Sequence, residues 1–163
     1  MLSKSLEQAI NDQIKNELFS GYLYLSMSAY LEANNMPGSA RWMRLQSQEE
    51  VSHAMKLFDY MNDRGSQVVL QAIDQPESEF GSVLDIFEKA FAHEQKVTAL
   101  INDIYELAVK ENDYPTQIEL QWFITEQVEE EKSASEIVEQ LKVIGDHGPS
   151  LIMLDRQLGA REG

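Results

Sequence analysis

The stretch Glu49-Glu50-Val51-Ser52-His53 combines metal-binding residue types at a spacing that a helix brings together. Glu50 and His53 lie three positions apart, so on a helix they share one face and are one turn from each other. A carboxylate oxygen beside a neutral imidazole is suited to a divalent transition metal. Such a pair is weakly specific by itself. How strongly the pair indicates a metal site depends on which other acidic residues the fold places beside it.

Helical periodicity and turn residues divide the chain into four long helices and one short one. A capping box at Ser5 opens the first helix, Gly65 ends the second and Ser82 opens the third. Pro115 starts the fourth helix, and Ser150 caps the last. The predicted ranges are about 5–33, 39–64, 82–111, 115–145 and 150–158.

The segment from Ser66 to Gly81 lacks the helical pattern, and Pro76 forbids a continuous helix there. An extended segment of this length reaches about 50 Å, enough to run along a helix of about thirty residues. We therefore expect a long crossover that makes the third helix parallel to the second. The predicted fold is all-α: an up-down-down-up four-helix bundle over about 5–145 with a short fifth helix, forming a single domain over residues 1–163.

The two predicted helical hairpins repeat one polar pattern. Each carries Glu, then Glu or Gln 33 residues later, then His or Glu 36 residues after the first. The members are Glu17, Glu50 and His53 in the first hairpin, and Glu94, Gln127 and Glu130 in the second. All lie near helix midpoints, so antiparallel packing brings them to one level. The spacing predicts a polar layer in the middle of an apolar bundle.

Four of these residues are glutamates on inward-facing positions, where no Lys or Arg neutralises them. Burying an unpaired carboxylate is costly, so the group either stays protonated with a raised pKa or has a cation beside it. Protonated glutamates that only set the helix register are one interpretation. The other is a pair of metal ions, one held by Glu17, Glu50 and His53 and one by Glu50, Glu94 and Glu130. One imidazole among oxygen ligands favours Fe(II) or Mn(II), with zinc as a competitor.

The net charge, the lack of long apolar runs and the lack of cysteine exclude several kinds of partner and metal site. The net charge is −15, with 28 acidic against 13 basic residues, which repels nucleic acid and anionic membranes and concentrates cations. No apolar run approaches a membrane span, and the N-terminus lacks a secretory pattern. The chain has no cysteine, which excludes disulfides, iron–sulfur clusters and thiolate zinc sites. We expect a cytoplasmic protein with neither nucleic acid nor membrane as a partner.

The whole chain resembles the bacterial non-haem ferritins. The resemblance is carried by Glu17, Tyr24, the run Gln48–Ala54, the pair His93-Glu94, and Trp122 through Glu131. It implies a ferroxidase that oxidises Fe(II) with O2 or H2O2 at a di-iron centre. It further implies a homo-oligomeric hollow shell of 24 subunits that stores the Fe(III) mineral.

The resemblance also assigns residue roles. The first iron site matches Glu17, Glu50 and His53, and the second matches Glu50, Glu94 and Glu130, with Gln127 close by. A third, more exposed iron site matches Glu49, Glu126, Glu129 and Glu130. By position alone, Glu49, Glu126 and Glu129 are typical of a solvent-facing helix surface. Tyr24 is expected near the iron pair, as a hydrogen-bonding residue and electron donor.

Two departures from related proteins refine this expectation. Di-iron enzymes and bacterioferritins carry a second Glu-x-x-His, where this chain has Gln127-Val128-Glu129-Glu130. Loss of a nitrogen ligand weakens the second site, which suits iron passing through. Bacterioferritins place a haem-binding methionine where this chain has Val51, so no haem is expected. We expect His93 at the surface or an interface and both tryptophans, Trp42 and Trp122, as packing residues.

Three other classes compete with this interpretation. A di-iron peroxidase or oxygenase of the rubrerythrin kind normally needs an electron-delivery domain, often with Cys-x-x-Cys, and this chain has no cysteine. A non-catalytic helical bundle could buffer cations with the same acidic face. A twelve-subunit miniferritin holds its metal between subunits, whereas this chain carries a complete ligand set.

Overall fold

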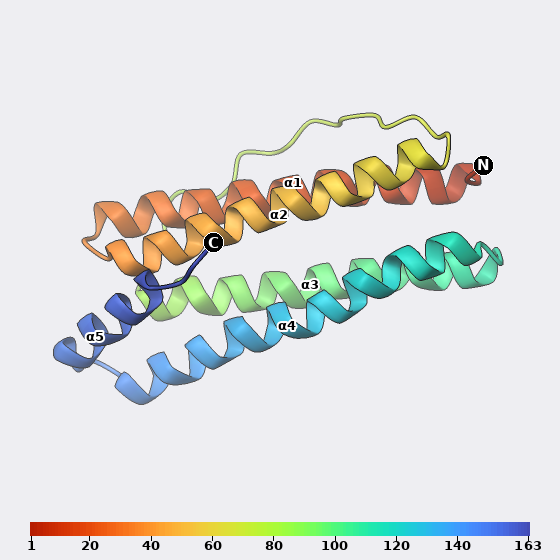
Figure 1. Ribbon diagram of the computed structural model, residues 1–163. Helices are drawn as coiled ribbons and strands as arrows, with labels where there is room; N and C mark the ends of the chain where they lie inside the picture. Colours follow the sequence, from red (N-terminus) through yellow and green to blue (C-terminus); the bar gives the residue numbers. More distant parts are fainter.

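The computed structural model describes residues 1–163 and contains helices and loops but no strand (Figure 1). The predicted all-α fold is confirmed. The helices are α1 (Lys4–Ala33), α2 (Pro37–Asp63), α3 (Val83–Lys110), α4 (Tyr114–Ile144) and α5 (Gly148–Gly159). Their ends lie within about two residues of the predicted ranges, the scatter expected of helix boundaries.

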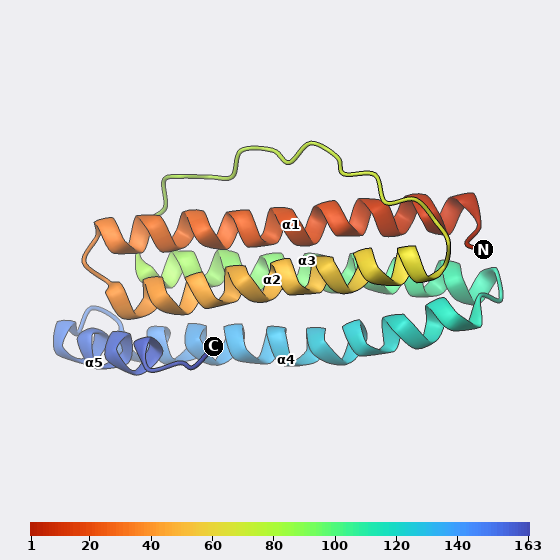
Figure 2. The same ribbon diagram turned by 45° about the horizontal axis from the view of Figure 1, so that its top comes forward.

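Helices α1 and α2 form one hairpin, and α3 and α4 form the other. Residues 64–82 leave the end of α2 and run along the outside of the bundle to its opposite end, where α3 begins (Figures 1 and 2). Helix α3 is therefore parallel to α2, as the length of the crossover predicted. The turns closing the hairpins use Asn35 and Asn112 at φ 61° and 57°, a left-handed conformation that asparagine tolerates.

The predicted caps were right at one helix and wrong at two. Ser82 and Asp85 form the expected capping box at α3. At α1 the cap is Ser3, whose Oγ accepts from the Leu6 amide at 3.1 Å, rather than Ser5. Ser3 Oγ also donates to Glu111 beyond the end of α3, a partner that only the folded chain supplies. At α5 the side chain of His147 accepts from the Ser150 amide, so Ser150 is not the cap.

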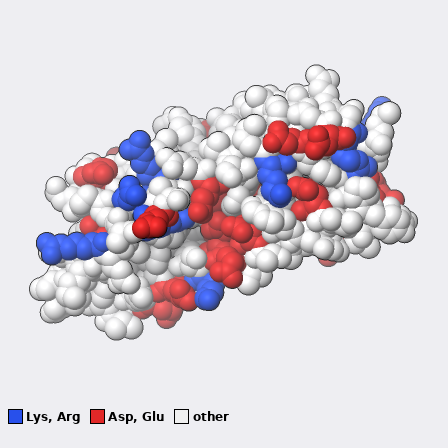
Figure 3. All heavy atoms as spheres, in the orientation of Figure 1, with Lys and Arg blue, Asp and Glu red and all other residues white.

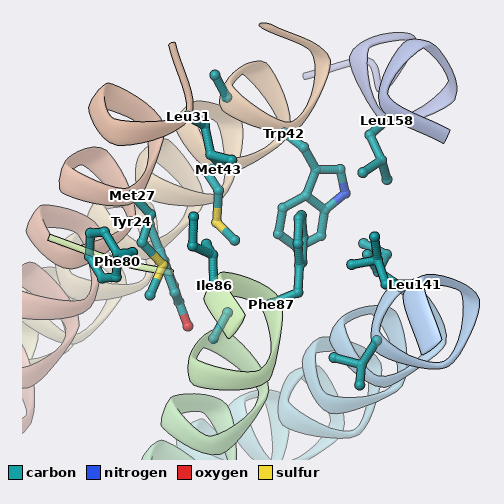
Figure 4. Close-up of a cluster of buried hydrophobic side chains, with 14 of the residues drawn as sticks. Tyr24, Met27, Leu31, Trp42, Met43, Phe80, Ile86, Phe87, Leu141 and Leu158 are labelled. Atoms are coloured by element: carbon teal, nitrogen blue, oxygen red, sulfur yellow. The ribbon is translucent and has the colours of Figure 1, made fainter. Parts of the chain in front are cut away.

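The apolar core forms two clusters. One cluster lies toward α5, and Figure 4 shows its members Trp42 and Phe87 packed edge to face, with Leu158 of α5 beyond the indole. The second cluster lies toward the chain's N-terminus and includes Ile10 and Phe123. Buried polar side chains from all four long helices lie between the clusters. This arrangement is the polar layer that the 33- and 36-residue spacings predicted.

Helix α2 receives its N-terminal cap from α5. Its own N-cap residue, Met36, offers no side-chain acceptor. The Asp155 carboxylate instead accepts from the amides of Gly38 and Ser39 at 2.9 and 2.7 Å, and from Ser39 Oγ at 2.7 Å. Gly38 permits this approach, because a Cβ there would lie 1.7 Å from the Asp155 carbonyl oxygen. The appended helix is thus anchored to the bundle by a buried polar contact.

The change Asp155→Ala is expected to destabilise the chain by about 1–3 kcal/mol, because two buried amides and one hydroxyl lose their acceptor. Chemical denaturation followed by far-UV circular dichroism measures this loss. The control is Arg156→Ala at the neighbouring exposed position. Equal stability of the two variants would show that α5 is held by its apolar contacts alone.

Candidate metal centre

Each long helix of the bundle contributes to the buried polar layer. The seven residues predicted for this layer are each no more than 6% exposed, so all of them lie inside the bundle. They are Glu17 and Tyr24 from α1, Glu50 and His53 from α2, Glu94 from α3, and Gln127 and Glu130 from α4. The inward positions derived from helical periodicity are therefore the buried positions in the fold.

The possible ligands form three groups, of which the two fully buried ones share one carboxylate; the third group is His53, Glu126 and Glu130. Glu17, Glu50 and His53 place ligand atoms within 4.8 Å of one another, and so do Glu50, Glu94 and Glu130. His53 Nδ1 lies 3.5 Å from the Glu50 carboxylate. Because Glu50 belongs to both buried groups, it lies between two adjacent positions where a cation would fit. A shared carboxylate of this kind is the arrangement of di-metal centres in helical bundles.

Amide and phenol groups hold the carboxylates in place. Gln127 Nε2 donates to Glu94 at 3.1 Å, and the Tyr24 hydroxyl donates to the other oxygen of the same carboxylate. Charge-assisted hydrogen bonds of this kind fix the orientation of a ligand before a metal arrives. In this structure Gln127 therefore contacts the second group of ligands through Glu94.

Two further residues of the layer were missed from the sequence, Gln13 and Gln46. Gln13 Nε2 donates to Glu17 at 2.9 Å, and Gln46 Nε2 donates to Glu130 at 2.5 Å and to Glu50 at 3.3 Å. Each glutamine precedes a buried glutamate by four residues, so both lie on the inward face. A second 33-residue spacing, from Gln13 to Gln46, was the available signal.

Burial makes negative charge in the layer costly, so its carboxylates either hold protons or have a cation beside them. Burial raises the pKa of Glu17 and of Glu50 well above the usual range. Neighbouring acidic groups raise the pKa of each carboxylate further. Burial likewise raises the pKa of Glu94, and it raises that of Glu130 to about 8. Glu17 Oε2 is buried without any hydrogen-bond partner. A buried carboxylate without a partner for one oxygen, grouped with a second carboxylate and an imidazole, fits a divalent metal.

A second group of acidic residues lies beside the buried layer. Figure 3 shows acidic side chains gathered near the middle of the molecule, along the line where α2 and α4 face each other. A cavity of about 210 Å³ opens there, hereafter the accessory pocket. It is lined by the four predicted third-site glutamates and by other side chains: Glu49, Glu126, Glu129, Glu130, Trp42, Gln46, Ser133 and Arg161. Glu130 borders both the pocket and the buried layer.

The structure shows where the two tryptophans and His93 lie. Trp42 packs in the core, whereas Trp122 is 41% exposed and packs at the edge of the bundle, with its ring centroid 4.9 Å from that of Phe123. Trp122 lies edge-on to His53, with ring centroids 5.4 Å apart. His93 is half-buried between α1 and α3, where its Nε2 lies 2.7 Å from Ser20 Oγ and burial lowers its pKa to about 4. His93 therefore packs beside Tyr24 and belongs to none of the ligand groups, and its place at a subunit interface stays a prediction.

The fold and the site together define a four-helix bundle with a buried carboxylate and histidine cluster of the di-metal type. A Ferritin-like domain model matches residues 7–144. The chain is 41% identical over 158 residues to a bacterial non-heme ferritin of Campylobacter jejuni, covering 97% of this chain and 95% of that one. It is 43% identical over 161 residues to that of Bacteroides fragilis, covering 99% and 100%. The chain belongs to the ferritin family.

Solved structures agree with this assignment. The open-pore ferritin of the archaeon Archaeoglobus fulgidus matches with a TM-score of 0.99 at 44% identity, covering 99% of this chain and 100% of that one. The ferritin-like form of the bundle is therefore confirmed. None of the helices combines the length and apolar character that a membrane span requires.

Proposed function

We propose that the protein stores iron and is a ferroxidase, which oxidises Fe(II) at the buried centre and passes Fe(III) to a mineral inside a shell of 24 subunits. The observation that carries the proposal is Glu50, which belongs to two adjacent groups of ligands in a chain of the ferritin family. Two Fe(II) ions bound side by side can together supply the two electrons that O2 or H2O2 accepts. The cytoplasm is the proposed location.

The roles of the residues follow from their chemistry. Glu17, Glu50 and His53 would bind one Fe(II), and Glu50, Glu94 and Glu130 the other. Arriving cations would displace the protons that the buried carboxylates hold, so binding releases protons. Gln127 supplies an amide in place of a second histidine, which keeps the second site weaker and lets oxidised iron leave. Glu49, Glu126, Glu129 and Glu130 would form the third site on the way out.

The test is anaerobic addition of Fe(II) to the iron-free protein, followed by O2, while ultraviolet absorbance and particle mass are recorded. Rapid oxidation that continues well past two irons per subunit, on a particle of 24 chains of 18.6 kDa, is the expected result. Oxidation that stops at two irons on a small particle would indicate a di-iron enzyme. Binding without oxidation would indicate a cation buffer, and a particle of twelve chains a miniferritin.

Tyr24 is proposed to position Glu94 and to supply an electron. The change Tyr24→Phe removes the phenol that donates to Glu94 while keeping the ring in the core. Iron oxidation is expected to slow by about tenfold, the scale seen when a group that orients a metal ligand is removed. Stopped-flow absorbance measures the rate. Tyr22→Phe, at a half-exposed position on the same helix, is the control; equal rates in both variants would remove Tyr24 from the mechanism.

A further inference from the structure

One basic side chain lines the accessory pocket, and it comes from the far end of the chain. Arg161 lies two residues beyond α5, in a tail that runs back from α5 toward the middle of the bundle (Figures 1 and 2). Its Nη2 is 2.9 Å from the Glu49 carboxylate, and its side chain is only 20% exposed. A guanidinium thus lies among the carboxylates that would form the third iron site.

The guanidinium is held by the fold. Nη1 of Arg161 donates to Gln46 Oε1 at 3.0 Å and to the Trp42 carbonyl oxygen at 3.3 Å. The guanidinium carbon lies 4.7 Å from the centre of the Trp42 ring, a cation–π contact. Arg41 donates to the backbone carbonyl of Arg161 at 3.4 Å. The anchoring of α5 through Asp155 fixes where this tail begins.

Arg161 also connects the accessory pocket to the buried layer. By donating to Gln46 Oε1, it leaves the Gln46 amide nitrogen to donate to Glu50 and Glu130. Glu130 borders both sites, so one glutamine links the tail to two carboxylates of the central cluster. A change in the position of Arg161 therefore acts on the same hydrogen-bond network that holds the central ligands.

We propose that Arg161 is a built-in counter-cation of the accessory pocket and competes with Fe(II) for Glu49. This inference rests on the proposed function, since it concerns the third iron site. The Glu49 oxygen that pairs with the guanidinium is not available to a metal, and the fixed positive charge repels a second cation nearby. Iron that uses this Glu49 oxygen must first displace Arg161, and the returning guanidinium promotes its release. The competition keeps the pocket a transit site.

The test measures anaerobic Fe(II) binding by titration calorimetry in wild type, Arg161→Gln and Arg156→Gln. Arg156→Gln is a matched control because it removes one charge from an exposed position of α5. We expect Arg161→Gln to bind Fe(II) about two- to fivefold more tightly at the accessory pocket, the range for a partly exposed ion pair. The central sites keep Gln46 and their own carboxylates, so their affinity is expected to change less than that of the accessory pocket. The control is expected to match the wild type at every site. Arg161→Lys, which keeps the charge, is expected to restore weak binding.

The outcomes separate this inference from the proposed function. If the central sites bind and oxidise iron in every variant while Arg161→Gln leaves the accessory affinity unchanged or weaker, the competition is wrong and the ferroxidase proposal stands. If the wild type binds no Fe(II), the proposed function fails first. In a Glu49→Gln background, the effect of Arg161→Gln is expected to disappear. A full effect in that background would contradict competition for Glu49.

A spectroscopic readout tests displacement directly. The chain has two tryptophans, so Trp122→Phe leaves Trp42, the ring beneath the guanidinium, as the sole emitter. Zn(II), which is not oxidised, is expected to change Trp42 emission when it displaces Arg161. The change should be lost in the Trp122→Phe, Arg161→Gln variant. If Zn(II) changes Trp42 emission equally with and without the Arg161→Gln substitution, the change does not come from displacement of the guanidinium.

Discussion

The change Glu50→Ala is expected to slow Fe(II) oxidation by at least about 100-fold while leaving the chain folded. Glu50 is the one carboxylate that belongs to both central groups of possible ligands, so its removal would affect both proposed iron positions. Loss of Glu17 or Glu94 alone would leave one group intact. Initial rates of Fe(III) absorbance after O2 addition, with circular dichroism as the check on folding, measure the effect.

Two controls sharpen this result. Glu50→Gln keeps the shape of the side chain and loses its charge. An oxidation rate as low as that of Glu50→Ala would show that the loss of the carboxylate, and not of side-chain volume, slows the reaction. Asp59→Ala removes an exposed carboxylate from the same helix and is expected to leave the rate unchanged. Oxidation at the wild-type rate in Glu50→Ala would refute the assignment of the centre.

The metal-free protein is expected to lose stability as the pH rises from about 7 to about 9. In the unfolded chain the four buried glutamates titrate near 4.5, whereas burial raises the pKa of Glu130 to about 8 in the fold and raises those of the other three. The folded state therefore binds more protons than the unfolded state in this interval. Stability conferred by those protons is present at low pH and is lost as the pH rises through the folded-state pKa values. The four groups share protons, so their contributions do not add.

Two other groups with shifted pKa values titrate below this interval. His93, whose pKa is lowered to about 4 by burial, is neutral in both states above pH of about 7. The hydrogen bond from Arg64 holds the pKa of Asp113 well below its usual range, so that ion pair titrates in acid. The window from about 7 to about 9 thus reports on the carboxylate layer.

Differential scanning calorimetry of the metal-free protein at several pH values measures this loss. Glu50→Gln removes one of the buried charges, so its melting temperature is expected to fall less steeply with pH and to exceed that of the wild type at the alkaline end. The same substitution would then abolish oxidation and increase stability. A melting temperature that rises with pH across this window would contradict the raised carboxylate pKa values. Added Zn(II) is expected to reverse the loss in the wild type by occupying the cluster.

Much of the fold and the central site could be predicted from the sequence because their causes are local or periodic. Helical periodicity sets which face of each helix is buried, and the 33- and 36-residue spacings place Glu17, Glu50 and His53 at one level. The missing helical pattern around Pro76, together with the length of that segment, predicted the crossover and hence the direction of α3. These features need only a 3.6-residue period and a known rise per residue.

The tertiary structure decided the features that depend on contacts between residues far apart in the chain. Asp155 caps a helix that begins more than a hundred residues earlier, and Arg161 reaches Glu49 across a similar separation. Ser3, the cap of α1, also bonds Glu111 beyond the end of α3, a contact that the local sequence does not reveal. No periodicity relates such residues, because their meeting depends on how whole helices dock. The ligands of the central site repeat along the chain, whereas the cation beside Glu49 comes from a tail that only the folded bundle brings there.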